Sequence, residues 1–462
     1  MTRITNPLGE TTQYEYDSLD LVTRVVDAAQ QATLFSYDGN GNILSITDAR
    51  NSVTSYIYDE MDRVTTRRDP LLHDVVSQYN AIGNVSQLTD RKNQVTQFTY
   101  DPLNRLTQVT YADSSTTTYT YDAVDRLTQV VDSISGTISY GYDNLDRVTS
   151  ETTPQGTVSY TYDAAGRSTT ITVLGQPTIS YTYDDDSRLT QITQGTATVS
   201  ITYNDAGERT SLTLPNGVVT EYEYDLASQL TKLTYKHAGN VLGDLSYEYD
   251  AAGRRTRMGG TFSRSVSPQP LSSATYNAAN QQMTFGSQAL TYDPNGNLTS
   301  DGENTYSWNA RDQLTSVSSP GISAAFEYDF VGRRITKNIN GAITSFLHDG
   351  NSVIQEQSTG LGTTNFLNGG LDEVFTRSSA SDIVEFLRDG LGSSLTLTSN
   401  AGSIQTEYAY GAFGKSAEYG SSGSNSIQYT GRENDGTGLQ YNRNRYYSPT
   451  LQRFISEDPI GF

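Results

Sequence analysis

The sequence predicts an all-β protein made of tandem β-hairpins, and three observations support this fold class. A Tyr-Asp pair, with Asn or Trp in some copies, recurs about every 21 residues. The third residue after the acid is Gly, Asp, Asn or Ser in every copy. The chain also contains 33 Tyr and many Thr, which favour strands. A fixed period of this length is typical of a repeat architecture, in which each small unit stacks on its neighbours.

About sixteen units follow one another. Their aromatic residues are Tyr16, Tyr37, Tyr58, Tyr79, Tyr100, Tyr121, Tyr142, Tyr162, Tyr183, Tyr203, Tyr224, Tyr249, Tyr276, Tyr292, Trp308 and Tyr328. In a typical unit, Tyr119 and Tyr121 stand two positions apart, so both side chains lie on one face of a strand. The residue three after the acid, for example Asp125, is of a type that tolerates a positive φ. We therefore expect it to be the left-handed residue of a tight turn.

The repeated acid has a structural interpretation. An Asp or Asn at the start of a turn accepts backbone N–H bonds within it, and we favour this role over catalysis. Arg often follows the left-handed residue, as in Arg63 and Arg126. We expect ladders of Asp–Arg contacts along the stacked hairpins, each worth little at the surface.

The length of the predicted sheet has a geometric consequence. Two strands from each of about sixteen units would form a sheet roughly 150 Å wide at ~4.8 Å per strand. Open sheets of more than about ten strands usually curl or split, and wide curled sheets enclose space. The repeat therefore favours a container. A straight β-solenoid rod and a propeller remain alternatives.

Composition excludes several classes of function. A net charge of −21 argues against nucleic acid as a partner, and with no cysteine a disulfide or thiol site is impossible. We expect His73, His237 and His348 in loops or at the surface, and we expect no cofactor and no metal.

No apolar stretch is long enough for a membrane span, and no signal peptide is visible. The opening residues, 2–9, read as the tail of a preceding repeat, so we expect sequence upstream.

The strict period ends near Thr336. Gly becomes dense beyond this point, and we expect shorter strands. We therefore predict two domains, with repeats over 1–343 and a different domain over 344–462. The second domain carries several motifs that occur once. They are Phe346-Leu-His-Asp-Gly350, Gly370-Leu-Asp-Glu373, Phe386-Leu-Arg-Asp-Gly-Leu-Gly-Ser393, Tyr408-Ala-Tyr-Gly-Ala-Phe-Gly414, Tyr429-Thr-Gly-Arg-Glu433 and the run from Gly438 to Gly461, which includes Arg445-Tyr-Tyr-Ser-Pro449 and Asp458-Pro-Ile-Gly461.

On these motifs the chain resembles the Rhs/YD-repeat family, which includes bacterial polymorphic toxins, the C components of insecticidal toxin complexes and, more distantly, teneurins. The Tyr-Asp units and the segment from Phe386 to Phe462 both carry the resemblance. It implies a curled or spiral β-sheet shell, closed by a C-terminal associated core that acts as a plug. It also implies a C-terminal toxin segment as cargo, and secretion or delivery machinery as a partner.

The resemblance also implies a site. In the family, the associated core cuts the chain through an aspartyl-protease-like arrangement, and its Arg and first Asp correspond to Arg445 and Asp458. Such chemistry needs two carboxylates that share a proton. The family's second Asp lies beyond Phe462, so we expect half a protease site in this sequence, and Glu457 does not replace the missing acid. A structural ion pair is the alternative role for Arg445 and Asp458. We expect Tyr441, Tyr446, Tyr447 and Phe454 to form the core of the plug.

The leading functional hypothesis is a structural shell, secreted or at the cell surface, that encloses and delivers a toxin. The alternative is a surface adhesin that binds carbohydrate or a partner cell through its tyrosines. The adhesin hypothesis predicts that Tyr119, Tyr140, Tyr160 and Tyr181 face solvent. An autonomous hydrolase has little support, because no nucleophile with a base, phosphate-binding loop or metal-ligand spacing is visible.

Overall fold

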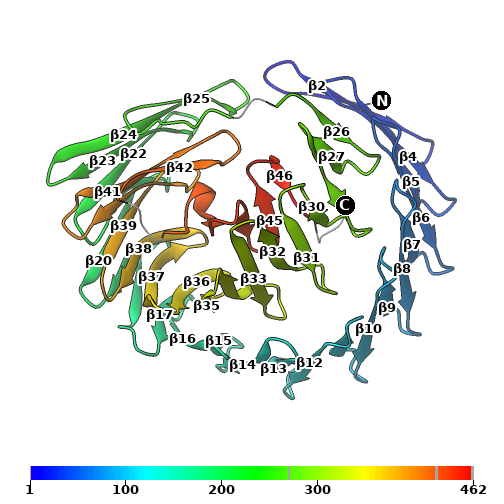
Figure 1. Ribbon diagram of the computed structural model, residues 1–462, viewed down its shortest axis with the longest axis horizontal. Helices are drawn as coiled ribbons and strands as arrows, with labels where there is room; N and C mark the ends of the chain where they lie inside the picture. Colours follow the sequence, from blue (N-terminus) through cyan, green and yellow to red (C-terminus); the bar gives the residue numbers. More distant parts are fainter. Residues whose placement is uncertain (1, 269–270, 422–424, 459–462) are drawn as a thin grey trace. The chain divides into compact units, whose positions relative to one another are not determined.

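The computed structural model describes residues 2–268, 271–421 and 425–458, and the fold is all-β, as predicted. The chain forms two compact units (Figure 1). Unit 1 comprises Met1–Thr118, Asp250–Arg254 and Leu271–Asp312, and unit 2 comprises Tyr119–Tyr249, Arg255–Pro270 and Gln313–Phe462.

The first twelve strands pair consecutively and antiparallel, each with the next. They are β1 (Thr2–Thr5), β2 (Thr11–Tyr16), β3 (Val22–Val26), β4 (Ala32–Tyr37), β5 (Ile43–Thr47), β6 (Val53–Tyr58), β7 (Val64–Arg68), β8 (Asp74–Tyr79), β9 (Val85–Thr89), β10 (Val95–Tyr100), β11 (Leu106–Thr110) and β12 (Thr116–Tyr121).

The predicted turn residue is left-handed in all sixteen units. Asp20 has φ 62°, Asn104 has φ 69° and Ser187 has φ 65°, and the glycines have φ between 77° and 93°. The acid that opens each turn accepts backbone N–H bonds: Asp17 Oδ1 lies 2.8 Å from the nitrogen of Leu19 and 3.0 Å from that of Leu21. Both predictions for the repeat turn are therefore confirmed.

A hydrogen bond that the sequence did not reveal ties at least ten of the hairpins to the preceding one. The Tyr of the Tyr-Asp pair donates its hydroxyl to a backbone carbonyl 14 to 19 residues upstream, and we call this the inter-hairpin hydrogen bond. It joins Tyr37 to Val22, Tyr58 to Ile43, Tyr79 to Val64, Tyr100 to Val85, Tyr142 to Leu127, Tyr162 to Val148, Tyr183 to Ser168, Tyr203 to Leu189, Tyr249 to Leu230 and Tyr328 to Leu314.

The predicted Asp–Arg ladder is also present. Arg147 pairs with Asp143 of its own turn at 2.6 Å, and its guanidinium lies 4.8 Å from the ring centroid of Tyr162 in the next unit. Its Nη1 donates to the carbonyl of Asp163. Arg147 thus links two successive turns. The same turn ion pair forms at Arg63, Arg105, Arg126, Arg167, Arg188, Arg254 and Arg333.

Unit 1 also contains short hairpins from its third segment. Their strands are β26 (Ala274–Tyr276), β27 (Gln282–Phe285), β28 (Gln288–Ala289), β29 (Thr291–Tyr292), β30 (Leu298–Ser300) and β31 (Thr305–Trp308).

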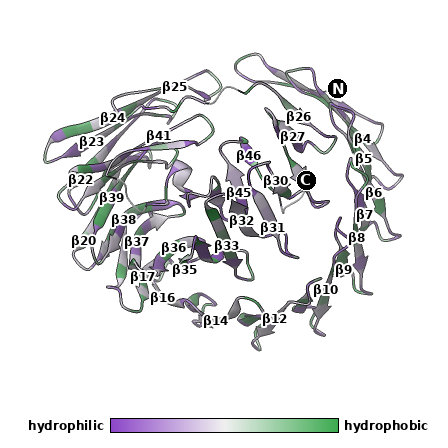
Figure 2. Cartoon of the chain, in the orientation of Figure 1, coloured by the Kyte–Doolittle hydropathy of each residue, from purple (hydrophilic) through white to green (hydrophobic). Residues whose placement is uncertain are grey.

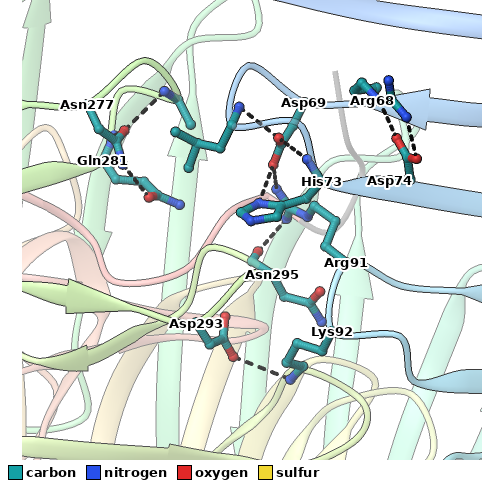
Figure 3. Close-up of polar contacts among 12 residues, drawn as sticks. Arg68, Asp69, His73, Asp74, Arg91, Lys92, Asn277, Gln281, Asp293 and Asn295 are labelled. Carbon is teal, nitrogen blue, oxygen red and sulfur yellow. Dashed lines mark hydrogen bonds and ion pairs between the residues drawn. The ribbon is translucent and has the colours of Figure 1, made fainter.

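Polar contacts join these short hairpins to the turns between β7 and β10 (Figure 3). Asp69, which is 6% exposed, pairs with Arg91, and Arg91 donates to the carbonyl of Asn295. Lys92 pairs with Asp293 at 3.3 Å. Hydrogen bonds and ion pairs therefore carry much of the cohesion of unit 1.

The next strands belong to unit 2 and also pair consecutively and antiparallel. They are β13 (Leu127–Asp132), β14 (Gly136–Tyr142), β15 (Val148–Thr153), β16 (Gly156–Tyr162), β17 (Ser168–Val173), β18 (Ile179–Tyr183), β19 (Leu189–Gln194), β20 (Ala197–Tyr203), β21 (Arg209–Thr213), β22 (Val218–Tyr224), β23 (Leu230–His237), β24 (Asn240–Tyr249) and β25 (Arg255–Gly259).

A second run of hairpins in unit 2 follows Gln313. Its strands are β32 (Leu314–Ser319), β33 (Ile322–Tyr328), β34 (Arg334–Ile339), β35 (Ala342–Asp349), β36 (Ser352–Ser358), β37 (Gly362–Gly370), β38 (Glu373–Ser379), β39 (Ile383–Arg388), β40 (Ser394–Ser399), β41 (Ile404–Tyr410) and β42 (Ser416–Gly420). These antiparallel runs are longer than a four-stranded propeller blade and unlike a parallel β-solenoid.

The two runs of unit 2 pack face to face around an apolar core. Val158, Ile192 and Leu233 from the first run lie in one cluster with Leu367 and Leu387 from the second. Apolar and polar residues alternate along the strands (Figure 2). The opposite face of the second run carries another cluster, which includes Phe366 and Phe386. Both faces of the second run are therefore buried, which accounts for its Phe-Leu pairs.

One expectation about the region after Thr336 holds only at its end, and another is wrong. Strands up to β41 do not shorten, since β35 has eight residues and β37 has nine, against six in β4. Among the described residues of this region, short strands of two to four residues occur only within 433–454. His348 is neither in a loop nor at the surface, because it lies in β35 and is 7% exposed. It occupies the repeat Tyr position, and its Nε2 lies 3.0 Å from the carbonyl oxygen of Arg334.

The inter-hairpin hydrogen bond survives this change of residue type. Asn368 Nδ2 donates to the carbonyl of Val353 at 2.9 Å, and Arg388 Nη1 donates to that of Asp372. The hairpin ladder therefore continues to β42 although the Tyr-Asp pattern stops. The division at residues 343 and 344 stays a prediction.

Candidate functional site in the C-terminal sheet

The last described residues form a small antiparallel sheet in unit 2, which we call the C-terminal sheet. It follows a short 3-10 turn, η1 (Tyr429–Gly431), and its strands are β43 (Glu433–Asn434), β44 (Gln440–Asn442), β45 (Arg445–Ser448) and β46 (Arg453–Phe454). A tight turn with Arg443 at φ 60° joins β44 to β45 and places Tyr441 opposite Tyr446.

One face of the C-terminal sheet packs on the second run of unit 2. The rings of Tyr446 and Phe326 lie 5.2 Å apart, and the hydroxyls of Tyr446 and Tyr328 lie 2.8 Å apart. Burial raises the pKa of both hydroxyls. Tyr441 is 6% exposed and Tyr446 3%, so these two lie in the core as predicted, whereas Tyr447 and Phe454 are only half-buried.

A buried ion cluster lies beside these aromatic rings. Arg334, which is 1% exposed, bonds Glu433 and Asp435 at 2.5 Å each, and Lys337 bonds Asp435 at 2.7 Å. The two cations hold the pKa of the Asp435 carboxyl well below its usual range against the effect of burial. The guanidinium also lies 4.3 Å from the ring centroid of Tyr441.

Arg445 of β45 meets Asp458, which lies four residues beyond the end of β46. Arg445 Nη2 lies 3.0 Å from Asp458 Oδ2, with 26% and 33% of the side chains exposed. The Arg445 guanidinium stacks 3.8 Å from the ring centroid of Phe454, whose edge meets the Tyr447 ring at 5.4 Å. The two residues that the sequence singled out are therefore neighbours, although their role stays a prediction.

The arrangement supplies one carboxylate with a cation beside it. Acid–base catalysis by a carboxyl pair needs a second group close to Asp458. Glu457 is exposed, and Glu433 and Asp435 are committed to Arg334. Residues 459–462, which carry the rest of the Asp-Pro-x-Gly motif, lie outside the described residues. Over the ranges that the structure describes, no cluster of three or more His, Asp or Glu side chains could hold a metal ion.

Sequence reasoning missed the cluster around Arg334. Gly332 is followed by Arg333 and Arg334, but Gly253 is likewise followed by Arg254 and Arg255, so the doubled Arg alone does not mark the cluster. Glu433 ends the Tyr429-Thr-Gly-Arg-Glu433 motif, whereas Asp435 fits no motif. Both partners lie about a hundred residues from Arg334.

A family comparison covers the whole chain. The Teneurin YD-shell family matches residues 1–129, 70–160, 128–240 and 218–462. The chain belongs to this YD-shell family. Two similar proteins are the tRNA nuclease WapA of Bacillus subtilis, 34% identical over 225 residues, and the tRNA(Glu)-specific nuclease WapA of Bacillus subtilis subsp. natto, 37% identical over 196 residues. The aligned parts are 46% and 40% of this chain, but 10% and 8% of those proteins.

Solved structures with the same fold include two crystal structures of TcdB2-TccC3. The YD-shell chain matches the complex TcdB2-TccC3-Cdc42 with a TM-score of 0.63, and TcdB2-TccC3 without its hypervariable C-terminal region with a TM-score of 0.64. Each match has 17% identity and covers 98% of this chain and 33% of the other. The chain thus spans about a third of those chains. None of the helices in the described ranges is long and apolar enough to cross a membrane.

Proposed function

We propose that this chain is part of the shell of a bacterial Rhs-type toxin, and that it encloses and delivers a toxin segment that follows the C-terminal sheet. The observation that carries the proposal is the match of all 462 residues to the YD-shell family. The fold shared with TcdB2-TccC3 and the similarity to the WapA nucleases support it. Such a protein works outside the cytoplasm, as a secreted or cell-surface protein, and its partners are its own cargo and a delivery machinery.

We further propose that Arg445 and Asp458 form half of a self-cleavage site that releases the cargo. Asp458 would share a proton with a carboxylate supplied from sequence beyond Phe462, and Arg445 would tune its acidity. Their contact at 3.0 Å supports the pairing.

The adhesin hypothesis finds no support in the tyrosines on which it depended. Tyr119, Tyr140, Tyr160 and Tyr181 are all half-buried instead of facing solvent. Tyr160 and Tyr181 pack on the core of unit 2, and Tyr160 donates to Asp349 at 2.9 Å. Burial raises the pKa of both phenols.

Protease protection tests the proposed enclosure. A flexible reporter peptide is fused after Phe462, and the same peptide is fused before Met1 in a matched control. We expect the C-terminal reporter to resist a broad-specificity protease and the N-terminal reporter to be removed at once. Equal removal of both reporters would contradict enclosure.

Self-cleavage needs the natural sequence that follows Phe462. In that longer chain we expect two fragments on a denaturing gel, and a single intact band for Asp458→Asn. Arg445→Lys keeps the charge and should slow the cut. Complete cleavage in Asp458→Asn would remove Asp458 from the mechanism and leave the enclosure proposal intact.

A further inference from the structure

The doubled arginine after Gly332 connects three layers of unit 2. Arg333 Nη2 bonds Glu151 of β15 in the first run at 2.7 Å, and its Nε bonds Asp329 at 2.6 Å. Arg334 instead bonds Glu433 and Asp435 of the C-terminal segment. Neighbouring residues thus hold opposite layers, because successive side chains of an extended segment point to opposite faces.

Arg334 also reaches the β44–β45 hairpin directly. Its backbone N–H donates to the Tyr441 hydroxyl at 2.9 Å, and its guanidinium stacks on the Tyr441 ring. Tyr441 is the cross-strand partner of Tyr446. Arg445 is the residue next to Tyr446 in the chain, and its guanidinium pairs with Asp458. A short covalent and hydrogen-bonded path therefore links Arg334 to Asp458.

The Arg445–Asp458 ion pair is not strong enough by itself to hold these two residues in place. Both side chains are partly exposed, and such ion pairs contribute little to stability. The Arg334 cluster is desolvated, and removal of Arg334 takes the ion-pair partner from Glu433 and leaves Asp435 with Lys337 alone, which is destabilising. The rigid support for the hairpin thus lies on the face away from Asp458.

We propose that Arg334 is the positioning residue for Asp458, and that it acts by anchoring the β44–β45 hairpin through Glu433, Asp435 and Tyr441. The anchor is a property of this chain, while the use made of Asp458 rests on the proposed self-cleavage. Arg333 fastens the first run of strands and has no part in placing Asp458.

Hydrogen exchange on the 462-residue chain tests this assignment. In Arg334→Met we expect amides of β44 and β45 to exchange about 100-fold faster than in the wild type, as for a broken buried ion pair. Amides of β16 to β24 should keep their protection. The matched control Arg333→Met should show the reverse, with faster exchange at β15 and little change at β45.

Two more variants keep the test decisive. Arg445→Ala should speed exchange at β45 by no more than about fivefold, because it removes a partly exposed pair. Arg334→Lys keeps the charge without the planar fork and should recover part of the lost protection. If Arg334→Met unfolds unit 2 entirely, Glu433→Gln gives the milder version of the same experiment, and it should loosen β44 and β45 selectively.

Unchanged exchange at β44 and β45 in both Arg334→Met and Glu433→Gln would overturn the proposal. So would an Arg445→Ala effect as large as that of Arg334→Met. Hydrogen exchange does not depend on self-cleavage. The test of Arg334 as the anchor of the β44–β45 hairpin can therefore be interpreted even if the self-cleavage proposal fails.

Discussion

The two units use the same repeat in different ways. Strands β2 to β10 of unit 1 contain one residue that is buried, Val26. Strands β16 to β24 of unit 2 place Val158, Ile192 and Leu245 at 0% exposure against a second run of strands. The repeat therefore forms a single layer where hydrogen bonds link neighbouring hairpins, and a sandwich where a second layer covers it. The inter-hairpin hydrogen bond is common to both units, so it belongs to the repeat and the apolar core is an addition.

The largest expected change in stability comes from truncating a core side chain of unit 2. Leu387 is 0% exposed between the two runs. We expect Leu387→Ala to lower the free energy of unfolding by about 3 kcal/mol, from lost burial and the cavity left behind. Chemical denaturation followed by circular dichroism measures the change.

The matched control lies in unit 1. Ile57 of β6 is 58% exposed. Ile57→Ala should change stability by less than about 0.5 kcal/mol, as surface substitutions usually do. Similar losses for Leu387→Ala and Ile57→Ala would show that the two units do not differ as described.

A buried acid in unit 2 gives the next effect, and the size of this effect depends on pH. Glu385 is 0% exposed, accepts one hydrogen bond from Thr376 at 2.6 Å and has an unpaired Oε1. Burial raises its pKa from 4.5 to about 7. The folded state therefore binds this proton more tightly than the unfolded state does. Stability is unaffected below pH ~4.5, falls as pH rises through the interval, and reaches its full loss above pH ~7.

Glu385→Gln removes the charge and tests this linkage. At pH 8 we expect the variant to be more stable than the wild type by about 3 kcal/mol, and at pH 4 to be equal to it. Thermal unfolding across this pH range measures the difference. An equal gain at both pH values would mean that the effect arises from packing and not from ionisation.

The smallest effect compares the shared hydrogen bond in the two units. Tyr58→Phe in unit 1 and Tyr183→Phe in unit 2 each remove one hydroxyl from an inter-hairpin hydrogen bond of 2.9 or 2.8 Å. We expect each variant to lose about 1 kcal/mol. Hydrogen exchange should show faster opening of β6 and β7 in the first variant, but a weaker local effect in the second, where the core holds the strands. Greater opening in unit 2 would contradict this order.

Local chemistry made much of the repeat predictable. Asp62 and Ser187 were identified as left-handed because few residue types tolerate that conformation, and Asp59 was identified as a turn acceptor because its carboxylate reaches nearby N–H groups. These features depend on residues within five positions of one another. The sequence also indicated that Arg445 and Asp458 belong together, through a resemblance instead of geometry.

Longer-range features could not be predicted from the sequence, because different residue types donate the same inter-hairpin hydrogen bond. His348, Asn368 and Arg388 all donate where Tyr does in the repeats, so a search for Tyr-Asp ends before the hairpins do. The Arg334 cluster joins residues about a hundred positions apart, and no local pattern marks Asp435 as its partner. His348 is buried as Tyr328 is at the same position of an earlier hairpin in the second run of unit 2.

The inter-hairpin hydrogen bond joins a hairpin only to the one before it. Tyr100 donates to the carbonyl of Val85, and Tyr79 donates to that of Val64. The geometry of such a bond does not depend on the total number of hairpins. Duplication or deletion of a whole repeat inside β2 to β11 would thus leave the remaining inter-hairpin hydrogen bonds intact, so gene duplication can change the length of the sheet in steps of one hairpin.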